Sequence, residues 1–196
     1  MSIKDNYKKL QSEFEELKAE YDFLIQASIL PDFDIMFNNI VKYLYNFYGF
    51  EGCGLSLVTP DKAHYKVEIS DYILGNSQEF GYLKELGKNL IGKVFPLDVS
   101  GGKVAECIKN NKTIYETDYD TTEIKNEADR KVIEIFKIKT TLHIPLKVKD
   151  EVIGSFLLTS FSKPVHLKET DIKSIERFSN QIVILLRNYR LYSELK

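Results

Sequence analysis

The side chains best placed to bind an anion lie in the run SGGK at positions 100–103. A glycine-rich turn that opens a helix offers free backbone N–H groups to a phosphate or carboxylate. The run lacks the earlier glycine of a phosphate-binding loop and its Lys-Ser/Thr ending. Two interpretations therefore stay open, an anion-binding turn and an ordinary capped helix start.

The sequence contains no motif for metal binding or for nucleophilic catalysis. The sequence holds no nucleophile elbow, nucleotide-binding fingerprint or zinc spacing. The three histidines, His64, His143 and His166, lie far apart and share no ligand spacing with Cys53 or Cys107. We predict no metal site and no catalytic residue, so the chain itself is not expected to be an enzyme. Its cofactor stays unassigned.

Residues 118–134 form an acidic stretch, with six acidic and three basic side chains. One interpretation is a solvated loop followed by a helix cap. The other is the rim of a small-molecule site, where Asp118 and Thr122 exchange hydrogen bonds with the ligand. An acidic rim of this kind disfavours a strongly anionic ligand.

The composition is that of an ordinary globular protein: 43% of the residues are hydrophobic, 29% are charged and the formal net charge is -2. This balance excludes a broad basic surface for nucleic acid. No apolar run approaches the roughly 20 residues that cross a bilayer, and the charged N-terminus is unlike a signal peptide. Two cysteines suit a reducing compartment. We expect a cytoplasmic protein with no nucleic-acid partner and no membrane insertion.

An amphipathic helix is predicted over residues 3–24, where apolar side chains alternate at spacings of four and three, the seam of a coiled coil. A helix so polar on its other faces needs a second helix to bury its stripe. Glu13 and Lys18 flank the stripe, and in a parallel dimer Glu13 of one helix lies near Lys18 of the other, where their opposite charges attract. We predict a homodimer, with packing of the stripe on its own domain as the alternative. The dimerisation residues of this stripe are Tyr7, Leu10, Phe14, Leu17 and Tyr21.

The rest of the chain is predicted to form a body of mixed helices and strands. Helices are expected at 33–47, 100–110, 123–136 and from 171, and strands at 52–59, 63–72, 95–99, 113–116, 140–148 and 152–161. Residues 72–91 show little periodicity and are expected to be mainly loop. The chain thus divides into an N-terminal helix (1–29), a core (30–170) and a C-terminal helix (171–196). That last helix adds Ile182, Leu185, Tyr189 and Tyr192 to the dimer.

The order of these pieces resembles a GAF domain over about residues 30–195. The most specific piece is TLHIPL at 141–146, a short turn, and VIGSFLL at 152–158. HLKETD at 166–171 resembles the family's entry to its closing helix, and residues 100–114 resemble its preceding helix-and-turn element. The resemblance implies an α+β fold with an antiparallel sheet of five or six strands. Terminal helices would cover one face, and a helical segment would roof a small-molecule pocket on the other.

The chain departs from the family's better-defined branches. The cyclic-nucleotide branch carries Asn-Lys after the last strand, where this chain has SFSK at 160–163. The bilin-binding branch needs a cysteine usually followed by histidine, but Ile108 follows Cys107. The branch that reduces free methionine sulfoxide needs several clustered cysteines, and this chain has two.

The resemblance implies a sensor or regulatory module of a signal-transduction protein. It would bind a small molecule, such as a cyclic nucleotide, and relay binding through a parallel helical dimer to an effector such as a cyclase or phosphatase. The alternatives are a dimerisation scaffold without a ligand and an enzyme like the methionine sulfoxide reductases. Strand alternation turns Thr141 and His143 toward the roof, where His143 is either a satisfied core residue or a pocket hydrogen-bonder. The predicted ligand-binding residues are Phe80, Phe95, Leu97, Val104, Cys107, Tyr115, Asp118, Thr122, Thr141, His143 and Leu158.

Overall fold

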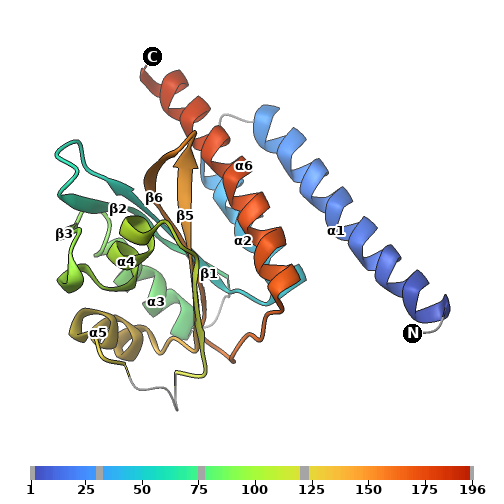
Figure 1. Ribbon diagram of the computed structural model, residues 1–196, viewed down its shortest axis with the longest axis horizontal. Helices are drawn as coiled ribbons and strands as arrows, with labels where there is room; N and C mark the ends of the chain where they lie inside the picture. The colour runs from blue at the N-terminus through green and yellow to red at the C-terminus, as the bar shows by residue number, and fades with distance from the viewer. Residues whose placement is uncertain (1–2, 30–32, 75–77, 120–123, 195–196) are drawn as a thin grey trace.

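A computed structural model describes residues 3–29, 33–74, 78–119 and 124–194 (Figure 1). The helices are α1 (Ile3–Ile29), α2 (Phe33–Tyr48), α3 (Gln78–Lys88), the 3-10 turn η1 (Val99–Gly101), α4 (Gly102–Asn110), α5 (Glu127–Phe136) and α6 (Glu169–Glu194). The strands are β1 (Gly52–Val58), β2 (His64–Ile73), β3 (Val94–Pro96), β4 (Ile114–Thr117), β5 (Thr140–Val148) and β6 (Glu151–Ser160).

The six strands form one antiparallel sheet in the order β3-β2-β1-β6-β5-β4. The predicted hairpin of β5 and β6 lies near its centre, with Leu142 opposite Leu158 and Ile144 opposite Phe156. Helices cover the sheet on both faces (Figure 1). The α+β fold expected from the sequence is therefore confirmed.

The first face of the sheet packs on α2 and α6. Leu142, Ile144 and Phe156 from the strands are at most 2% exposed and meet Phe37 of α2 and Phe178 of α6 in one hydrophobic core. These strand residues alternate with side chains that point to the other face, which is the period-two pattern of a sheet covered on both sides.

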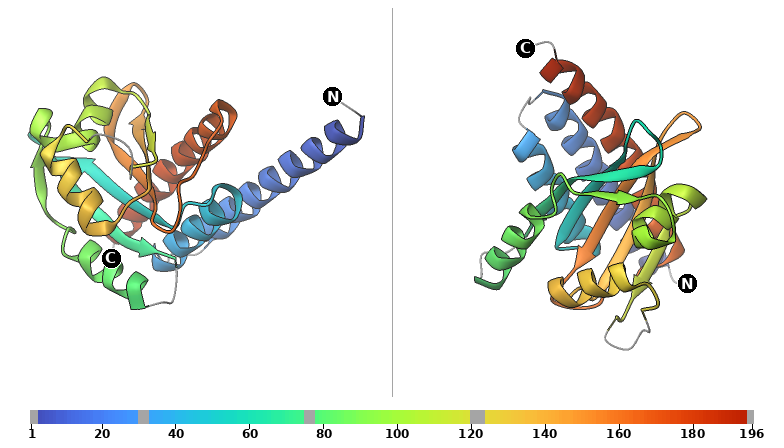
Figure 2. Two further views of the ribbon diagram at one scale, coloured as in Figure 1. Left: turned by 90° about the horizontal axis from the view of Figure 1, so that it is seen from below. Right: turned by 90° about the vertical axis from the view of Figure 1, so that its left-hand side faces the viewer.

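The second face of the sheet is covered by α3, α4 and α5 (Figure 2). Helix α4 places Cys107 over β6, where the Ser155 hydroxyl donates to Cys107 Sγ at 3.7 Å. Helix α3 lies close to β2, because Gly87 has no side chain: a Cβ there would come within 2.0 Å of the Ser70 carbonyl oxygen. These three helices form the roof that the resemblance implied.

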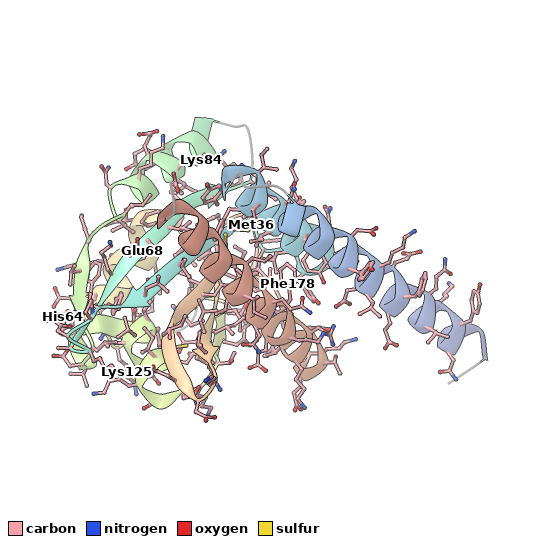
Figure 3. All side chains as sticks on the ribbon, turned by 90° about the horizontal axis from the view of Figure 1, so that it is seen from above. Met36, His64, Glu68, Lys84, Lys125 and Phe178 are labelled. Atoms are coloured by element: carbon pink, nitrogen blue, oxygen red, sulfur yellow. The ribbon has the colours of Figure 1, made fainter. Side chains whose placement is uncertain are left out.

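Helix α1 extends well beyond the rest of the molecule (Figures 2 and 3). One side of it touches the body, since the Tyr48 hydroxyl donates to Glu16 Oε1 at 2.5 Å and Ala19 packs at the edge of the core. The apolar stripe points away: its five residues, Tyr7, Leu10, Phe14, Leu17 and Tyr21, are 56–68% exposed. No helix in the described part of the chain combines the length and apolar character needed to span a bilayer.

Two predicted elements differ from the structure. Residues 72–91 are not mainly loop, since α3 spans Gln78–Lys88; Gly81 and Gly87 weaken the helical signal of that segment. The helix expected from residue 123 begins at Glu127, with Asn126 as its N-cap. Residues 120–123 lie outside the described chain.

Candidate functional site

A half-open cavity of about 630 Å³ lies between α3, α5 and the loops at the ends of β4, β5 and β6, and is called here the α3–α5 cavity. Four aromatic side chains line it: Phe80 from α3, Tyr119 after β4, Phe136 at the end of α5 and Phe161 after β6. Leu83, Ile124, Ile133 and Ile138 complete its apolar wall. A concave site of this size and composition suits a small organic molecule.

Charged side chains also line the α3–α5 cavity. Among the described residues these are Arg130, Lys137 and Lys139, which are basic, and Glu134, which is acidic. Arg130 is held in place because its guanidinium donates from Nη2 to the Ile124 carbonyl at 2.8 Å. Of the acids in residues 118–134, Glu134 lines this cavity and Asp129 faces α4, whereas Asp120 and Glu123 lie outside the described residues, so the acidic rim stays a prediction.

Phe161 is positioned from two sides. Its ring lies over Gly52, where an added Cβ would come within 3.0 Å of it, and meets the Phe80 ring edge-on at 6.4 Å between centroids. Its backbone N–H donates to Glu51 Oε2 at 2.7 Å, and Glu51 itself is buried at the start of β1. Phe161, which forms part of the cavity wall, is therefore hydrogen-bonded to the residue that precedes β1.

Tyr119 links the cavity to a partly buried chain of polar side chains. Its hydroxyl lies 2.6 Å from Thr141 Oγ1 and donates to Glu116 Oε2 at 2.8 Å. Glu116 pairs in turn with Lys103 of α4 at 2.7 Å. Burial raises the pKa of the Tyr119 hydroxyl, so this group stays protonated at neutral pH.

The SGGK run at the start of α4 is capped from within the molecule. Both carboxylate oxygens of Asp129, on α5, accept the backbone N–H of Lys103 at 3.1 and 3.2 Å. Gly102, at φ +68°, allows this approach, because a Cβ there would lie 2.3 Å from Asp129 Oδ1. Burial raises the pKa of Asp129. A carboxylate of the chain itself thus takes the anion position, which favours the capped-helix interpretation.

A second cavity, of about 550 Å³, lies between α4 and α5. Lys103, Glu106 and Glu116 line it together with Asn126 and Asp129. Ile124 lines both this cavity and the α3–α5 cavity, so α5 and the residues before it form a wall between the two.

The structure brings only part of the predicted ligand set together. Phe80 lines the α3–α5 cavity, and Thr141 lies behind Tyr119. Phe95, Leu97 and Val104 pack instead in a small core with Tyr65 under α4. Asp118 Oδ2 lies 3.8 Å from His166 Nδ1, and Asp118 is not among the residues that line either cavity. Thr122 lies outside the described residues.

Tyr115 and Leu158 lie on the opposite face of the sheet from the roof. Both pair with Leu142, whose side chain belongs to the core against α2 and α6. The Tyr115 hydroxyl donates to the Val165 carbonyl at 2.6 Å and accepts the Leu167 N–H at 3.0 Å. Tyr115 therefore holds the segment that leads from β6 to α6.

His143 faces the roof as strand alternation predicted, and it is 5% exposed. Its Nδ1 has no hydrogen-bond partner among the described residues. Burial lowers the pKa of His143 to about 4, so the imidazole is neutral at pH 7.

The two cysteines lack the environment of reactive thiols. Cys53 and Cys107 are both buried and free. Burial raises the pKa of the Cys107 thiol to about 12 and also raises that of Cys53. Neither lines the α3–α5 cavity. The described residues also contain no group of three or more His, Cys, Asp and Glu side chains placed to hold a metal ion.

Several residues of the site were absent from the sequence prediction, among them Tyr119, Phe136, Phe161 and Arg130. They come from the end of β4, from α5 and from the segment after β6, which meet through the packing of the roof on the sheet. For Tyr119, Phe136 and Phe161 the aromatic ring was the single available signal, and it does not select them because the chain has 12 Phe and 12 Tyr residues.

Comparisons with known proteins agree with this architecture. The family profile described as GAF domain matches residues 31–187. No curated protein sequence matches the chain.

Solved structures share its fold. The GAF domain of an Acinetobacter phosphoenolpyruvate-protein phosphotransferase has 10% identity and a TM-score of 0.63, over 92% of this chain and 98% of that one. The GAF domain of a Bacillus halodurans two-component sensor histidine kinase has 19% identity and a TM-score of 0.59, over 84% and 99%. A free methionine-R-sulfoxide reductase from Neisseria meningitidis has 13% identity and a TM-score of 0.58, over 90% and 91%.

Proposed function

This chain belongs to the GAF domain family, and from that premise we propose that it is a sensor module that binds a small molecule in the α3–α5 cavity and relays binding to α6. GAF domains occur in signalling proteins such as the sensor histidine kinase named above. The observation that carries the proposal is the cavity wall itself. Phe161 and Ser162 line the cavity and are also the first residues of the segment that connects β6 to α6.

The relay would run through the connecting segment, residues 161–168, which is held at three points. Glu51 accepts the N–H groups of Phe161 and Ser162, and the Thr140 hydroxyl accepts the Val165 N–H at 2.8 Å. Tyr115 holds Val165 and Leu167 from the other side. A ligand that moves the Phe161 ring would strain these contacts and so shift the start of α6. The ligand can shift this equilibrium only to the extent that it binds the displaced position of the Phe161 ring more tightly than the position seen here.

The exposed stripe of α1 supports the proposed homodimer. Five apolar residues that are more than half exposed on one helix face are costly to leave in water. The face of α1 that touches its own body carries Glu16 and Ala19 instead, so the stripe is open to a second copy. Ile182 of α6 is buried in the core of its own domain and Leu185 is half-buried at its edge, whereas the side chains of Tyr189 and Tyr192 lie outside those described.

We propose further that the module acts on an attached effector, such as a cyclase or phosphatase, in the cytoplasm. The buried free cysteines suit a reducing compartment. An enzyme of the methionine sulfoxide reductase type gains no support, because neither cysteine reaches the α3–α5 cavity.

A thermal-shift screen against a panel of metabolites, cyclic nucleotides included, tests the ligand proposal. A ligand at 100 times its Kd stabilises the folded state by about 2.7 kcal/mol, which raises the Tm of a domain of this size by roughly 5–10 °C. Ile133→Trp fills the cavity from α5 and should abolish the shift. Ile135→Trp, on the same helix but 52% exposed, should leave it unchanged. A scaffold without a ligand would show no shift in any variant.

A further inference from the structure

Helix α5 is held to the molecule differently at its two ends. Its two buried side chains, Ile133 and Phe136, lie in its last turn, where they pack with Leu83 of α3 and with Ile138. None of its first six residues, 127–132, is buried. The first half of α5 therefore gains little from the hydrophobic effect, and its position depends on hydrogen bonds.

Two side chains fasten this first half to the roof, and we call them the α5 latch. The Asp129 carboxylate accepts the Lys103 N–H at the start of α4 at 3.1 and 3.2 Å. Asn126 donates from Nδ2 to the Val99 carbonyl of η1 at 2.7 Å, while its Oδ1 caps α5 by accepting the N–H groups of Ala128 and Asp129. Both contacts attach the start of α5 to the same short segment, residues 99–103.

The surroundings of α5 leave room for movement. The α3–α5 cavity lies on one side of the helix, and the cavity of about 550 Å³ lies on the other side, against α4. An apolar hollow of about 60 Å³ is lined by Val132 of α5 and by Leu157 and Thr159 of β6. Because close packing is what resists displacement in a protein interior, these spaces lower the cost of moving the first turns of α5.

We propose that the first turns of α5 are a gate of the α3–α5 cavity, closed by the α5 latch and hinged at the last turn of the helix. When Asp129 and Asn126 release segment 99–103, the first turns lift from the sheet while Phe136 stays in the core. Arg130, which lines the cavity, moves with them. That the motion admits a ligand rests on the proposed function of the cavity, whereas the motion itself requires no ligand.

Thiol labelling without any ligand detects the open gate. Thr159 is 7% exposed and lines the hollow together with Val132 and Phe136 of α5, so Thr159→Cys places a thiol that is shielded while the gate is closed. Its rate of reaction with N-ethylmaleimide then follows the population of the open form. Cys53 is the internal control, because it pairs with Leu158 and packs in the core on the opposite face of the sheet. Mass spectrometry of the peptides measures both thiols in one sample.

Variants of the α5 latch are compared in this Thr159→Cys protein. Asp129→Ala removes a charged acceptor and should accelerate labelling at position 159 by about 10- to 100-fold. Asn126→Ser keeps a capping residue for α5 but removes the donor to Val99, and should accelerate labelling by about 2- to 10-fold. Glu127→Ala is the matched control, because it removes an exposed carboxylate from the same turn, and should change the rate by less than about threefold.

The outcomes separate the gate from the sensor function. Acceleration in the latch variants that is confined to the introduced thiol supports the gate. Equal rates in Asp129→Ala and Glu127→Ala would overturn it, as would an equal acceleration at Cys53, which signals unfolding of the whole domain. If the labelling accelerates as expected but no compound of the metabolite panel shifts the Tm, the sensor function falls and the motion of α5 stands.

Discussion

Ser162 and Glu51 are 111 residues apart in the sequence and are joined by two hydrogen bonds: the Ser162 hydroxyl donates to Glu51 Oε1 at 2.5 Å, and the Ser162 N–H donates to Oε2 at 2.8 Å. The Phe161 N–H donates to the same Oε2. One buried carboxylate thus ties the start of β1 to the segment that begins at the cavity and ends at α6. This contact joins the proposed ligand site to the proposed output helix.

Replacing Glu51 should weaken the fold as well as the relay. Glu51→Ala leaves the N–H groups of half-buried Phe161 and exposed Ser162 without their acceptor, and we expect a loss of about 1–2 kcal/mol in the free energy of unfolding. Urea denaturation measures it. Glu85→Ala on the surface of α3 is the control and should change stability by less than about 0.5 kcal/mol. A Glu51→Ala protein as stable as the control would show that the connecting segment is held by other contacts.

The close approach of Asp129 to the first turn of α4 makes Gly102 intolerant of a side chain. Gly102→Ala forces a Cβ against the carboxylate at a positive φ and should cost about 2 kcal/mol or more of stability. Gly81→Ala, within α3 and with no neighbour within 4 Å, should instead stabilise by about 0.5–1 kcal/mol. Chemical denaturation of the two variants should therefore shift in opposite directions, and a shared direction speaks against the Asp129 cap.

His143 should make the fold sensitive to acid. Its pKa is about 4 in the folded protein and about 6.5 in an unfolded chain, so the unfolded chain binds more protons between these values. The stabilising contribution is complete above pH 6.5 and is lost as the pH falls toward 4, by about 3 kcal/mol in all. His143→Gln should flatten this part of the stability–pH curve, whereas His166→Gln, at a largely exposed site, should not. An unchanged curve in His143→Gln means that another group causes the acid sensitivity.

The role of the α1 stripe in dimerisation can be tested by placing charged residues in it. Leu10→Asp with Leu17→Asp places two carboxylates in the seam and should give a monomer in analytical ultracentrifugation. Lys8→Gln with Ser12→Asp changes the net charge by the same two units at heptad positions away from the seam and should leave the dimer intact. A dimer of unchanged affinity in the seam variant would refute this interface.

Local patterns were enough to predict most of the fold. The spacing of four and three predicted α1 and α6, and the alternating apolar runs predicted the β5–β6 hairpin. Helix α3 escaped prediction because Gly87, which lowers helix propensity, is there to let the helix approach the Ser70 carbonyl. That requirement comes from a neighbour distant in sequence, so no local pattern reports it.

The site was harder to predict than the fold, because the face that a side chain occupies depends on strand register. Alternation along β5 correctly turned Thr141 and His143 toward the roof. Leu158 and Tyr115 lie on the other face because they pair with Leu142. The sequence of one strand does not determine which residues of the neighbouring strand it pairs with. Phe161 and Tyr119 enter the site from loops, whose paths follow from tertiary packing.

Amide hydrogen exchange of the full chain tests the central claim most directly, measured with and without the compound that gives the largest shift in the thermal screen. The account predicts slower exchange in α3, α5 and the connecting segment from Phe161, accompanied by a change in the first turns of α6. In Glu51→Gln the cavity should still be protected while the response of α6 diminishes. Protection that is confined to the cavity, or that lies outside it, would contradict the claim that this domain senses a ligand and reports it through α6.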